Sequence, residues 1–292
     1  MMQINKEKTI REAHQWASSF LKEHQIETPD LEAEVFIRHL YNWDRTKFFF
    51  YLNQEIEKEK YGQLQEMVER RIKHEPLQYI IGVQEFYGRD FHVNPNVLIP
   101  RPETELLVEE VIKTATEMFG KENELIKVID IGTGSGAIAI TLALEKPSWE
   151  LHTVDISDKA LETARKNGEH LKANVNFHLG NALEPAIAQG IKVDIIVSNP
   201  PYIPSEDINT LMEEVKNHEP ILALDGGEDG LDFYRDIIEK ADYVLNHPGF
   251  IAFEIGIGQE LAIKNLFELK GATQVKIIND FQDIPRIVIG IF

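Results

Sequence analysis

The run Asn199-Pro200-Pro201-Tyr202 combines polar, rigid and aromatic groups at a point where a strand must end. Residues 193–198 before it are apolar and predict a buried strand, and neither proline has an N–H to continue a strand ladder. The corner offers the side-chain oxygen of Asn199, the carbonyl of Pro200 and the ring of Tyr202. Two acceptors beside an aromatic face suit a planar NH2 group, such as an amide or an exocyclic base amine. The alternative is an ordinary Pro-Pro loop with an Asn turn residue.

A second group, Gly132-Thr133-Gly134-Ser135-Gly136, joins a predicted strand that ends at Ile131 to a predicted helix that begins at Ala137. Glycines in such a turn let a ligand lie against the backbone, and the helix N-terminus favours a negative group. Asp155 ends the next predicted strand, where a carboxylate can accept both ribose hydroxyls of a nucleoside. The G-x-G-x-G spacing differs from that of nicotinamide oxidoreductases and of phosphate loops. A lone glycine-rich turn is a weak signal, but the turn, Asp155 and the corner together favour a nucleoside-type cofactor site.

Alternating strands and helices predict how these residues are positioned. From residue 126 onward the sequence predicts strands at 128–131, 151–155, 175–179, 193–198, 250–255, 273–278 and 286–292, and helices at 137–144, 158–171, 231–245 and 259–269. This alternation predicts an α/β fold whose mostly parallel sheet is covered on both faces. The last two strands leave no room for a helix between them and should pair antiparallel. Glu254 ends a later strand, and we expect its side chain to face solvent.

The N-terminal part reads differently. Residues 1–84 show apolar positions at helical spacing and predict a small helical bundle, in which Thr28 and Pro29 open one helix. Residues 85–97 form a linker with a predicted hairpin turn at Gly88-Arg89, and residues 98–292 form the α/β part. The bundle is either a structural appendage or a module that recognises a partner.

Composition narrows the class of protein. The 292 residues contain 43% apolar residues and no cysteine, which excludes disulfides, thiolate metal sites and a thiol nucleophile. The net charge is −19, and residues 85–292 carry 18 Lys+Arg against 35 Asp+Glu, a net charge of −17. Such a balance opposes a nucleic-acid substrate, which normally requires a basic surface. With no signal peptide and no apolar run of membrane-spanning length, we expect a soluble cytoplasmic protein.

These motifs carry a family resemblance. Residues 130–136, Asp155 and the run 199–202 resemble motifs of class I S-adenosylmethionine-dependent methyltransferases that act on planar nitrogens. The segments LIPRPE at 98–103, NPPYI at 199–203, HEP at 218–220 and GEDGLDFYR at 227–235 are similar to those of the PrmC/HemK family. Members of that family are protein-glutamine N5-methyltransferases that modify the glutamine of the Gly-Gly-Gln loop in peptide chain release factors. The similarity runs over nearly the whole chain.

The resemblance implies a fold and a cofactor site. The implied fold is a Rossmann-like, seven-stranded, mostly parallel sheet with an antiparallel last strand, plus a small N-terminal helical bundle joined by a β-hairpin. The implied cofactor is S-adenosylmethionine, with S-adenosylhomocysteine as product, and no metal is expected. The implied cofactor-binding residues are Gly132, Thr133, Gly134, Ser135, Gly136, Asp155, Asn181, Ala182 and Asn199. Many relatives have an acidic residue near the adenine where this chain has Asn181, and some have a larger side chain in place of Ala182, so we expect binding with altered contacts.

The resemblance also implies direct transfer of the methyl group to an amide nitrogen. Asn199 and Pro200 would accept the two N–H bonds, Pro201 would hold the corner rigid, and Tyr202 would pack on the flat amide. The implied partners are release factors, with no stable nucleic-acid partner and no membrane. The main alternative is an N-methyltransferase that acts on an exocyclic base amine of RNA or DNA. A nucleoside-binding regulator without turnover is a second alternative, disfavoured because a binder does not need the acceptor pair.

Overall fold

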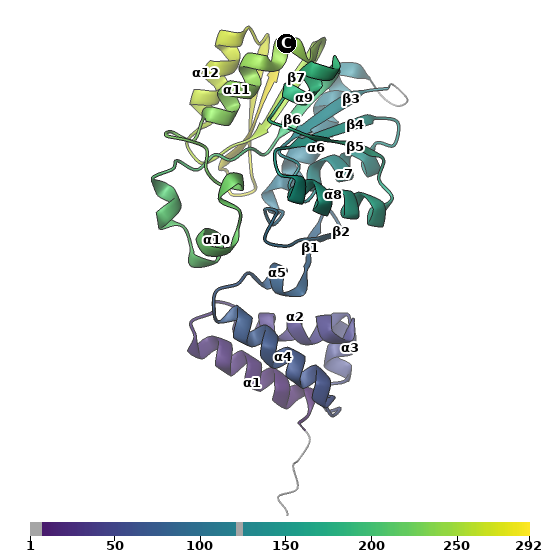
Figure 1. The fold of residues 1–292 in the computed structure, drawn as a ribbon, viewed down its shortest axis with the longest axis vertical. Helices are drawn as coiled ribbons and strands as arrows, with labels where there is room; N and C mark the ends of the chain where they lie inside the picture. The colour runs from purple at the N-terminus through teal and green to yellow at the C-terminus, as the bar shows by residue number, and fades with distance from the viewer. Residues whose placement is uncertain (1–7, 121–124) are drawn as a thin grey trace, which may run out of the picture. The chain divides into compact units, whose positions relative to one another are not determined.

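Two units make up the fold, and each is described by itself. The computed structural model describes residues 8–120 and 125–292. Of the described residues, the first unit contains those up to Gly82 together with Glu213–His218, and the second contains those of Val83–Met212 and Glu219–Phe292. Figure 1 shows the helices of the first unit and the sheet of the second.

The first unit is a bundle of short helices, as the sequence predicted. Its helices are α1 (Ile10–Glu23), α2 (Pro29–Tyr41), α3 (Arg45–Phe50), α4 (Lys58–Arg71), α5 (Leu77–Ile81) and α10 (Glu213–His218). Thr9 caps α1 in a reciprocal arrangement with Glu12, which satisfies two orphan backbone donors. Pro29 is the first residue of α2 after Thr28, but the Thr28 side chain makes no capping hydrogen bond.

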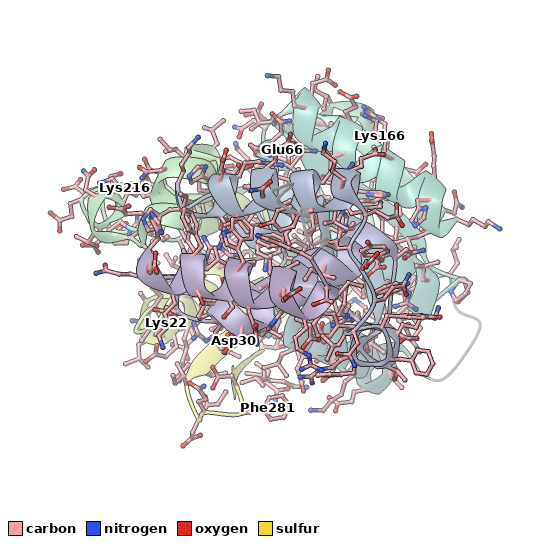
Figure 2. The ribbon with its side chains drawn as sticks, turned by 90° about the horizontal axis from the view of Figure 1, so that it is seen from below. Lys22, Asp30, Glu66, Lys166, Lys216 and Phe281 are labelled. Atoms are coloured by element: carbon pink, nitrogen blue, oxygen red, sulfur yellow. The ribbon has the colours of Figure 1, made fainter. Side chains whose placement is uncertain are left out.

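An apolar interior and a charged exterior explain why the bundle forms. Phe36 and Leu64 are fully buried, and Figure 2 shows polar side chains such as Lys22 of α1 and Glu66 of α4 on the surface. Inside the unit, Arg71 pairs with Glu32 at 2.6 Å and also with Glu214 of α10 at 2.9 Å. The guanidinium of Arg71 in α4 therefore links α10 to α2 and α4, although α10 lies far from both helices in the sequence.

A two-stranded hairpin opens the second unit. Strands β1 (Val83–Phe86) and β2 (Arg89–His92) pair antiparallel, with Phe86 opposite Arg89. The predicted turn at Gly88-Arg89 is therefore wrong by one residue, because Tyr87 and Gly88 form it. Both have positive φ angles, 53° and 71°, as the type I′ form of a two-residue hairpin turn requires at its central positions.

The second unit is built on a seven-stranded sheet, and the predicted fold class is confirmed. Its strands are β3 (Lys127–Ile131), β4 (Glu150–Asp155), β5 (Val175–Leu179), β6 (Val193–Ser198), β7 (Leu245–Glu254), β8 (Gln274–Asn279) and β9 (Pro285–Ile291). They lie in the order β5-β4-β3-β6-β7-β9-β8. The first five are parallel, and β9 is antiparallel to both of its neighbours, as the short connection between the last two strands predicted.

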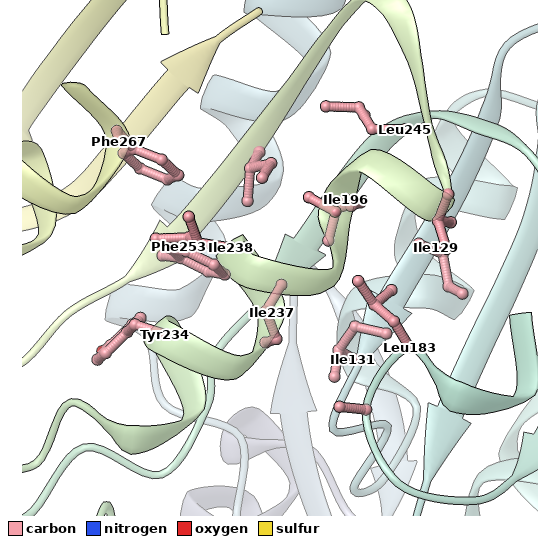
Figure 3. Packing of buried hydrophobic residues seen from close by; sticks show 14 of the residues in the cluster. Ile129, Ile131, Leu183, Ile196, Tyr234, Ile237, Ile238, Leu245, Phe253 and Phe267 are labelled. Atoms are coloured by element: carbon pink, nitrogen blue, oxygen red, sulfur yellow. The ribbon is translucent and has the colours of Figure 1, made fainter. Parts of the chain in front are cut away.

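Helices cover both faces of the sheet. One core joins the sheet to α9 (Glu184–Gln189), α11 (Asp232–Lys240) and α12 (Glu260–Lys270), and a second joins it to α6 (Glu103–Phe119), α7 (Ala137–Glu145) and α8 (Asp158–Leu171). Figure 1 shows α11 and α12 together on one side of the sheet, and Figure 3 shows the first core. Neighbours on β6 alternate between the cores, since Ile196 belongs to the first and Ile195 and Val197 to the second.

The second unit also contains short 3-10 helices, and its strand β7 starts earlier than the sequence predicted. The 3-10 helices are η1 (Asp207–Thr210), η2 (Ile221–Ala223) and η3 (Ala241–Tyr243). The helix predicted over 231–245 ends at Lys240, and β7 starts at Leu245 instead of residue 250. Leu245 pairs with Val193, so pairing with β6 extends the strand beyond its most apolar part. No helix in the described ranges is long and apolar enough to cross a membrane.

Candidate active site

Four parallel strands bring the predicted site residues to one edge of the sheet. Ile131 at the end of β3 lies opposite Ser198 at the end of β6, and the Ser198 hydroxyl donates to the Ile131 carbonyl at 2.6 Å. Gly132 and Asn199 follow directly. The chain continues to β4 and β5 on one side of β3 and returns to β6 on the other, so this edge contains the topological switch point where open α/β sheets bind ligands.

A pocket opens at this edge and collects most of the predicted residues. Its lining includes the predicted cofactor and corner residues Gly132, Gly134, Asp155, Asn181, Ala182, Asn199, Pro200 and Pro201. Its other walls come from the segments before α6 and around η2, including Leu98, Pro220 and Leu222, and from Phe233 of α11. Thr133, Ser135, Gly136 and Tyr202 are not among the lining residues. The pocket is therefore bounded by glycine backbone, a carboxylate, an amide and apolar side chains.

The glycine-rich turn has the shape that a close ligand needs. Gly132 has φ +84°, and a Cβ atom there would lie 3.9 Å from the Asn199 carbonyl oxygen, between the two strand ends. Gly136 has φ +86°, and a Cβ atom there would come within 2.6 Å of the Ile140 Cδ1 atom. Thr133 and Ser135 are 4% and 3% exposed, so their side chains point into the protein and their contribution to a ligand would come from the backbone.

Asp130 lies beneath this turn and was not singled out as a site residue from the sequence. Its Oδ2 atom accepts from the Thr153 hydroxyl at 3.1 Å, and that hydroxyl lies 2.6 Å from the Thr133 hydroxyl. Within the described ranges, its Oδ1 atom has no hydrogen-bond partner. Complete burial raises the pKa of Asp130 to about 8. In the sequence, an acidic residue inside an apolar strand directly before a glycine-rich turn is the pattern that could have identified Asp130.

Asp155 is held rigidly at the mouth of the turn. Its Oδ2 atom accepts from the Gly134 N–H at 2.9 Å and its Oδ1 atom from the Ser157 N–H at 2.8 Å. Burial raises the pKa of Asp155, while these backbone hydrogen bonds oppose the rise. Because each carboxylate oxygen can accept more than one hydrogen bond, both atoms retain capacity for ligand hydroxyls.

Asn181 and Ala182 follow β5 at the same edge. The Asn181 side-chain nitrogen donates to Glu184 at 3.3 Å, which leaves the side-chain oxygen available. Ala182 has φ +44° and is 8% exposed, so its methyl group forms part of the pocket wall. Their effect on adenine contacts stays a prediction.

Neighbouring backbone fixes the Asn-Pro-Pro-Tyr corner. A Cβ atom at Gly230 would lie 2.3 Å from the Tyr202 carbonyl oxygen, and one at Gly226 would lie 2.8 Å from the Pro201 carbonyl oxygen. The Gln259 side-chain nitrogen donates to the Tyr202 carbonyl at 2.9 Å. Glycine at 226 and 230 thus allows this segment to pack closely against the corner. Gly230 belongs to the GEDGLDFYR segment at 227–235, so this packing explains one glycine of that motif.

Tyr202 packs behind the corner. Its side chain is only partly exposed and packs against the first core. Burial, followed by the negative charge of Glu254, raises the pKa of Tyr202 to about 12, so the phenol is neutral at physiological pH. Contact of this ring with a bound amide stays a prediction.

Glu254 is where the structure contradicts the sequence-based expectation. The side chain was expected to face solvent, but it is 3% exposed. Phe253 pairs with Ser198, so Glu254 at the end of β7 lies beside Asn199, the residue that follows β6. Burial raises the pKa of Glu254 to about 7. The sequence indicates that Glu254 ends a strand, but it does not show that α6 covers this strand end. The contact with α6 is what buries the Glu254 side chain.

An ion pair joins two other recognised motifs. Arg101 of the LIPRPE segment donates to Glu219 of the HEP segment at 2.6 Å, and the Glu219 side chain is 2% exposed. These segments adjoin Leu98 and Pro220 in the pocket wall. A buried carboxylate depends on its partner, so this pair holds two walls of the pocket in register.

Comparisons with known proteins agree with this arrangement. Residues 12–82 match the PrmC N-terminal domain family, and residues 102–228 match the methyltransferase small domain family. A release factor glutamine methyltransferase from Bacillus subtilis is 44% identical over 283 residues, which cover 96% of this chain and 97% of that protein. One from Bacillus cereus is 45% identical, with 89% of this chain and 90% of that protein covered. This chain belongs to the release factor glutamine methyltransferase family.

Solved structures support the fold of this family member. A methyltransferase from Pyrococcus furiosus has a TM-score of 0.51 at 20% identity, covering 70% of this chain and 90% of that one. The Mettl16 catalytic domain, solved in complex with an RNA hairpin of the MAT2A 3′UTR, has a TM-score of 0.53 at 18% identity, covering 80% and 82%. At these identities the likeness concerns the methyltransferase fold alone.

Proposed function

We propose that this chain transfers a methyl group from S-adenosylmethionine to the side-chain amide nitrogen (N5) of the glutamine in the Gly-Gly-Gln loop of peptide chain release factors. The observation that carries the proposal is that the Asn199 corner and the glycine turn line one pocket, in a chain of this family. The enzyme would act in the cytoplasm, where release factors work.

The residues around the pocket fit the cofactor. Gly132 and Gly134 leave the backbone open to a ligand, and Asp155 presents carboxylate oxygens suited to ribose hydroxyls. Asn181 offers a side-chain oxygen for an exocyclic amine, and Ala182 leaves room beside it. Thr133, Ser135 and Gly136 shape the turn, and Asn199 closes the pocket toward the substrate. When bound, the cofactor supplies a methyl group already activated on a sulfonium.

The corner would act by orienting a poor nucleophile. The lone pair of an amide nitrogen is delocalised into its carbonyl, so the nitrogen needs positioning and charge stabilisation. The Asn199 side-chain oxygen and the Pro200 carbonyl would accept the two N–H bonds, and both residues line the pocket. Pro201 restricts the backbone, and Tyr202 would support the flat amide. These groups stabilise the positive charge that grows on nitrogen during transfer.

The helical bundle would recognise the intact release factor. Phe49 and Phe50 of α3 are 54% and 78% exposed, and exposed aromatic side chains are typical anchors of protein interfaces. Replacing both (Phe49→Ser with Phe50→Ser) should raise the KM for an intact release factor about 10-fold and leave kcat unchanged, because neither residue lines the pocket. Steady-state kinetics would check this.

Two controls accompany the bundle experiment. Glu66→Ser, at an exposed polar position of α4, should leave the KM unchanged. A short peptide that carries Gly-Gly-Gln should be methylated equally by the wild type and the double variant. If the double variant shows an unchanged KM for the intact factor, this surface of the bundle does not dock the substrate.

Methyl transfer from isotope-labelled cofactor tests the proposed function against its main alternative. A purified release factor should accept label, whereas RNA and DNA at matched concentration should accept little. The second unit, which holds the pocket, lies almost entirely within the part of the sequence that carries a net charge of −17 and would repel a phosphate backbone. Labelling of nucleic acid instead of the release factor would favour the base-amine alternative.

A further inference from the structure

Glu254 is a buried carboxyl group beside the reacting corner, and it has no role in the function proposed so far. Its side chain is 3% exposed, and hydrogen bonding with the side chains of Thr104 and Asn199 opposes the rise in its pKa that burial causes. Its Oε2 atom has no hydrogen-bond partner in the described part of the chain. A buried acid costs free energy, so its place beside a reacting side chain calls for a reason.

The neighbours of Asn199 decide which end of its amide faces the pocket. The Asn199 side-chain nitrogen donates to the Thr104 hydroxyl oxygen at 3.2 Å. Because Phe253 pairs with Ser198, the buried Glu254 carboxyl group also lies beside Asn199. An ionised carboxylate can only accept, so the group that faces it must be the NH2 end of the amide. The side-chain oxygen of Asn199 then faces away from Thr104 and Glu254, and Asn199 is one of the residues that line the pocket.

We propose that Glu254 and Thr104 are positioning residues that hold the Asn199 amide with its oxygen toward the methyl-accepting nitrogen. The inference rests on the proposed function, because it needs the acceptor role of Asn199. Without this pair the amide could rotate by half a turn and present its NH2 group to the substrate NH2 group, donor against donor. Fixing the acceptor before the reaction removes that cost from the transition state.

The sheet and α6 place this pair independently of the corner. Thr104 is in the first turn of α6 and is 4% exposed, and Glu254 ends β7. Other ionisable groups around Glu254 are Glu103 of α6, Arg286 of β9 and the phenols of Tyr202 and Tyr234. Burial, with a smaller contribution from the charge of Glu103, raises the pKa of Glu254 to about 7 against the opposing effects of Thr104, Arg286 and Asn199.

Substitution of Glu254 provides the test. The activity of the purified wild-type enzyme on a release factor is measured first, as the reference. Glu254→Leu removes both acceptors and should lower kcat roughly 10-fold, the scale seen when partners that orient a reacting group are removed. The KM and the cofactor affinity should stay unchanged. Glu254→Gln keeps one acceptor for the Asn199 NH2 group and should retain most of the activity. Thr104→Ser should likewise retain more activity than Thr104→Val.

A double-mutant cycle separates positioning from general structural damage. In the Asn199→Ala background there is no amide to orient, so Glu254→Leu should cause no further loss of kcat. If Glu254→Leu lowers kcat by the same factor with Asn199 present and in the Asn199→Ala background, the proposal is overturned. Full activity of Glu254→Leu would overturn it as well. If Glu254→Leu does not fold, the pair Thr104→Val and Thr104→Ser in the same cycle decides in its place.

The pH profile supplies a readout that a structural role would not change. Because its pKa lies near 7, Glu254 has two acceptor oxygens above that pH, and below it one acceptor oxygen and one O–H donor. The wild-type kcat should therefore fall as the pH drops through about 7, to about the level of Glu254→Gln, and Glu254→Gln should itself lack this decline. The same decline in Glu254→Gln would contradict the proposal. Absence of any methyl transfer by the wild type would instead contradict the proposed function.

Discussion

Asn199→Ala is expected to lower kcat about 100-fold or more, by analogy with the loss of one preorganised charge-stabilising group. The Asn199 oxygen would accept a hydrogen bond that strengthens as the target nitrogen becomes positive, so its loss falls on the transition state more than on the ground state. Cofactor affinity should hardly change, because the turn at 132–136 and Asp155 remain. Single-turnover kinetics on a release factor, with cofactor binding measured by calorimetry, would check both parts.

Asn199→Asp is the matched variant. It keeps an acceptor but adds a charge and loses the NH2 group that donates to Thr104. We expect it to retain more activity than Asn199→Ala, because the acceptor oxygen remains. If Asn199→Ala transfers methyl groups near the wild-type rate, the acceptor role is wrong and the corner is structural.

Asp155→Ala should weaken cofactor binding by about 1–3 kcal/mol, the cost of leaving hydrogen-bonding groups without partners. This corresponds to roughly a 5- to 150-fold increase in the dissociation constant. The substitution would also leave the N–H groups of Gly134 and Ser157 without their carboxylate acceptor, which adds to the loss of order in the turn. Isothermal titration calorimetry would measure the change.

Asp155→Asn is the control for the backbone contacts of this carboxylate. It retains one acceptor oxygen and should bind the cofactor between the wild type and Asp155→Ala. Thermal unfolding without ligand would show whether either variant damages the fold. Unchanged affinity in Asp155→Ala would exclude Asp155 as the ribose-binding residue.

Much of the sheet could be predicted because its signals are local. Strands such as β6 are buried on both faces and read as continuous apolar runs, and the helices between them have clear apolar periodicity. The short connection between β8 and β9 was sufficient to predict antiparallel pairing. Placement of Gly132 and Asn199 at one edge followed from the rule that parallel strands end together.

What could not be predicted depends on contacts between distant segments. Glu254 looks like an exposed strand end in the sequence, but the pairing of β7 with β6 and the packing of α6 bury it beside Asn199. The early start of β7 at Leu245 depends in the same way on its pairing with Val193. The predicted hairpin turn differs from the observed one by one residue, because strand register, and not only glycine content, determines which two residues have positive φ.

Mass spectrometry of a release factor after incubation with this chain and S-adenosylmethionine tests the central claim most directly. We expect the mass of one methyl group on the glutamine of the Gly-Gly-Gln loop, dependent on the cofactor and strongly reduced with Asn199→Ala. A release factor in which that glutamine is replaced by asparagine should stay unmodified. Methylation at another residue, or an unmodified release factor in the presence of folded enzyme with bound cofactor, would contradict the account.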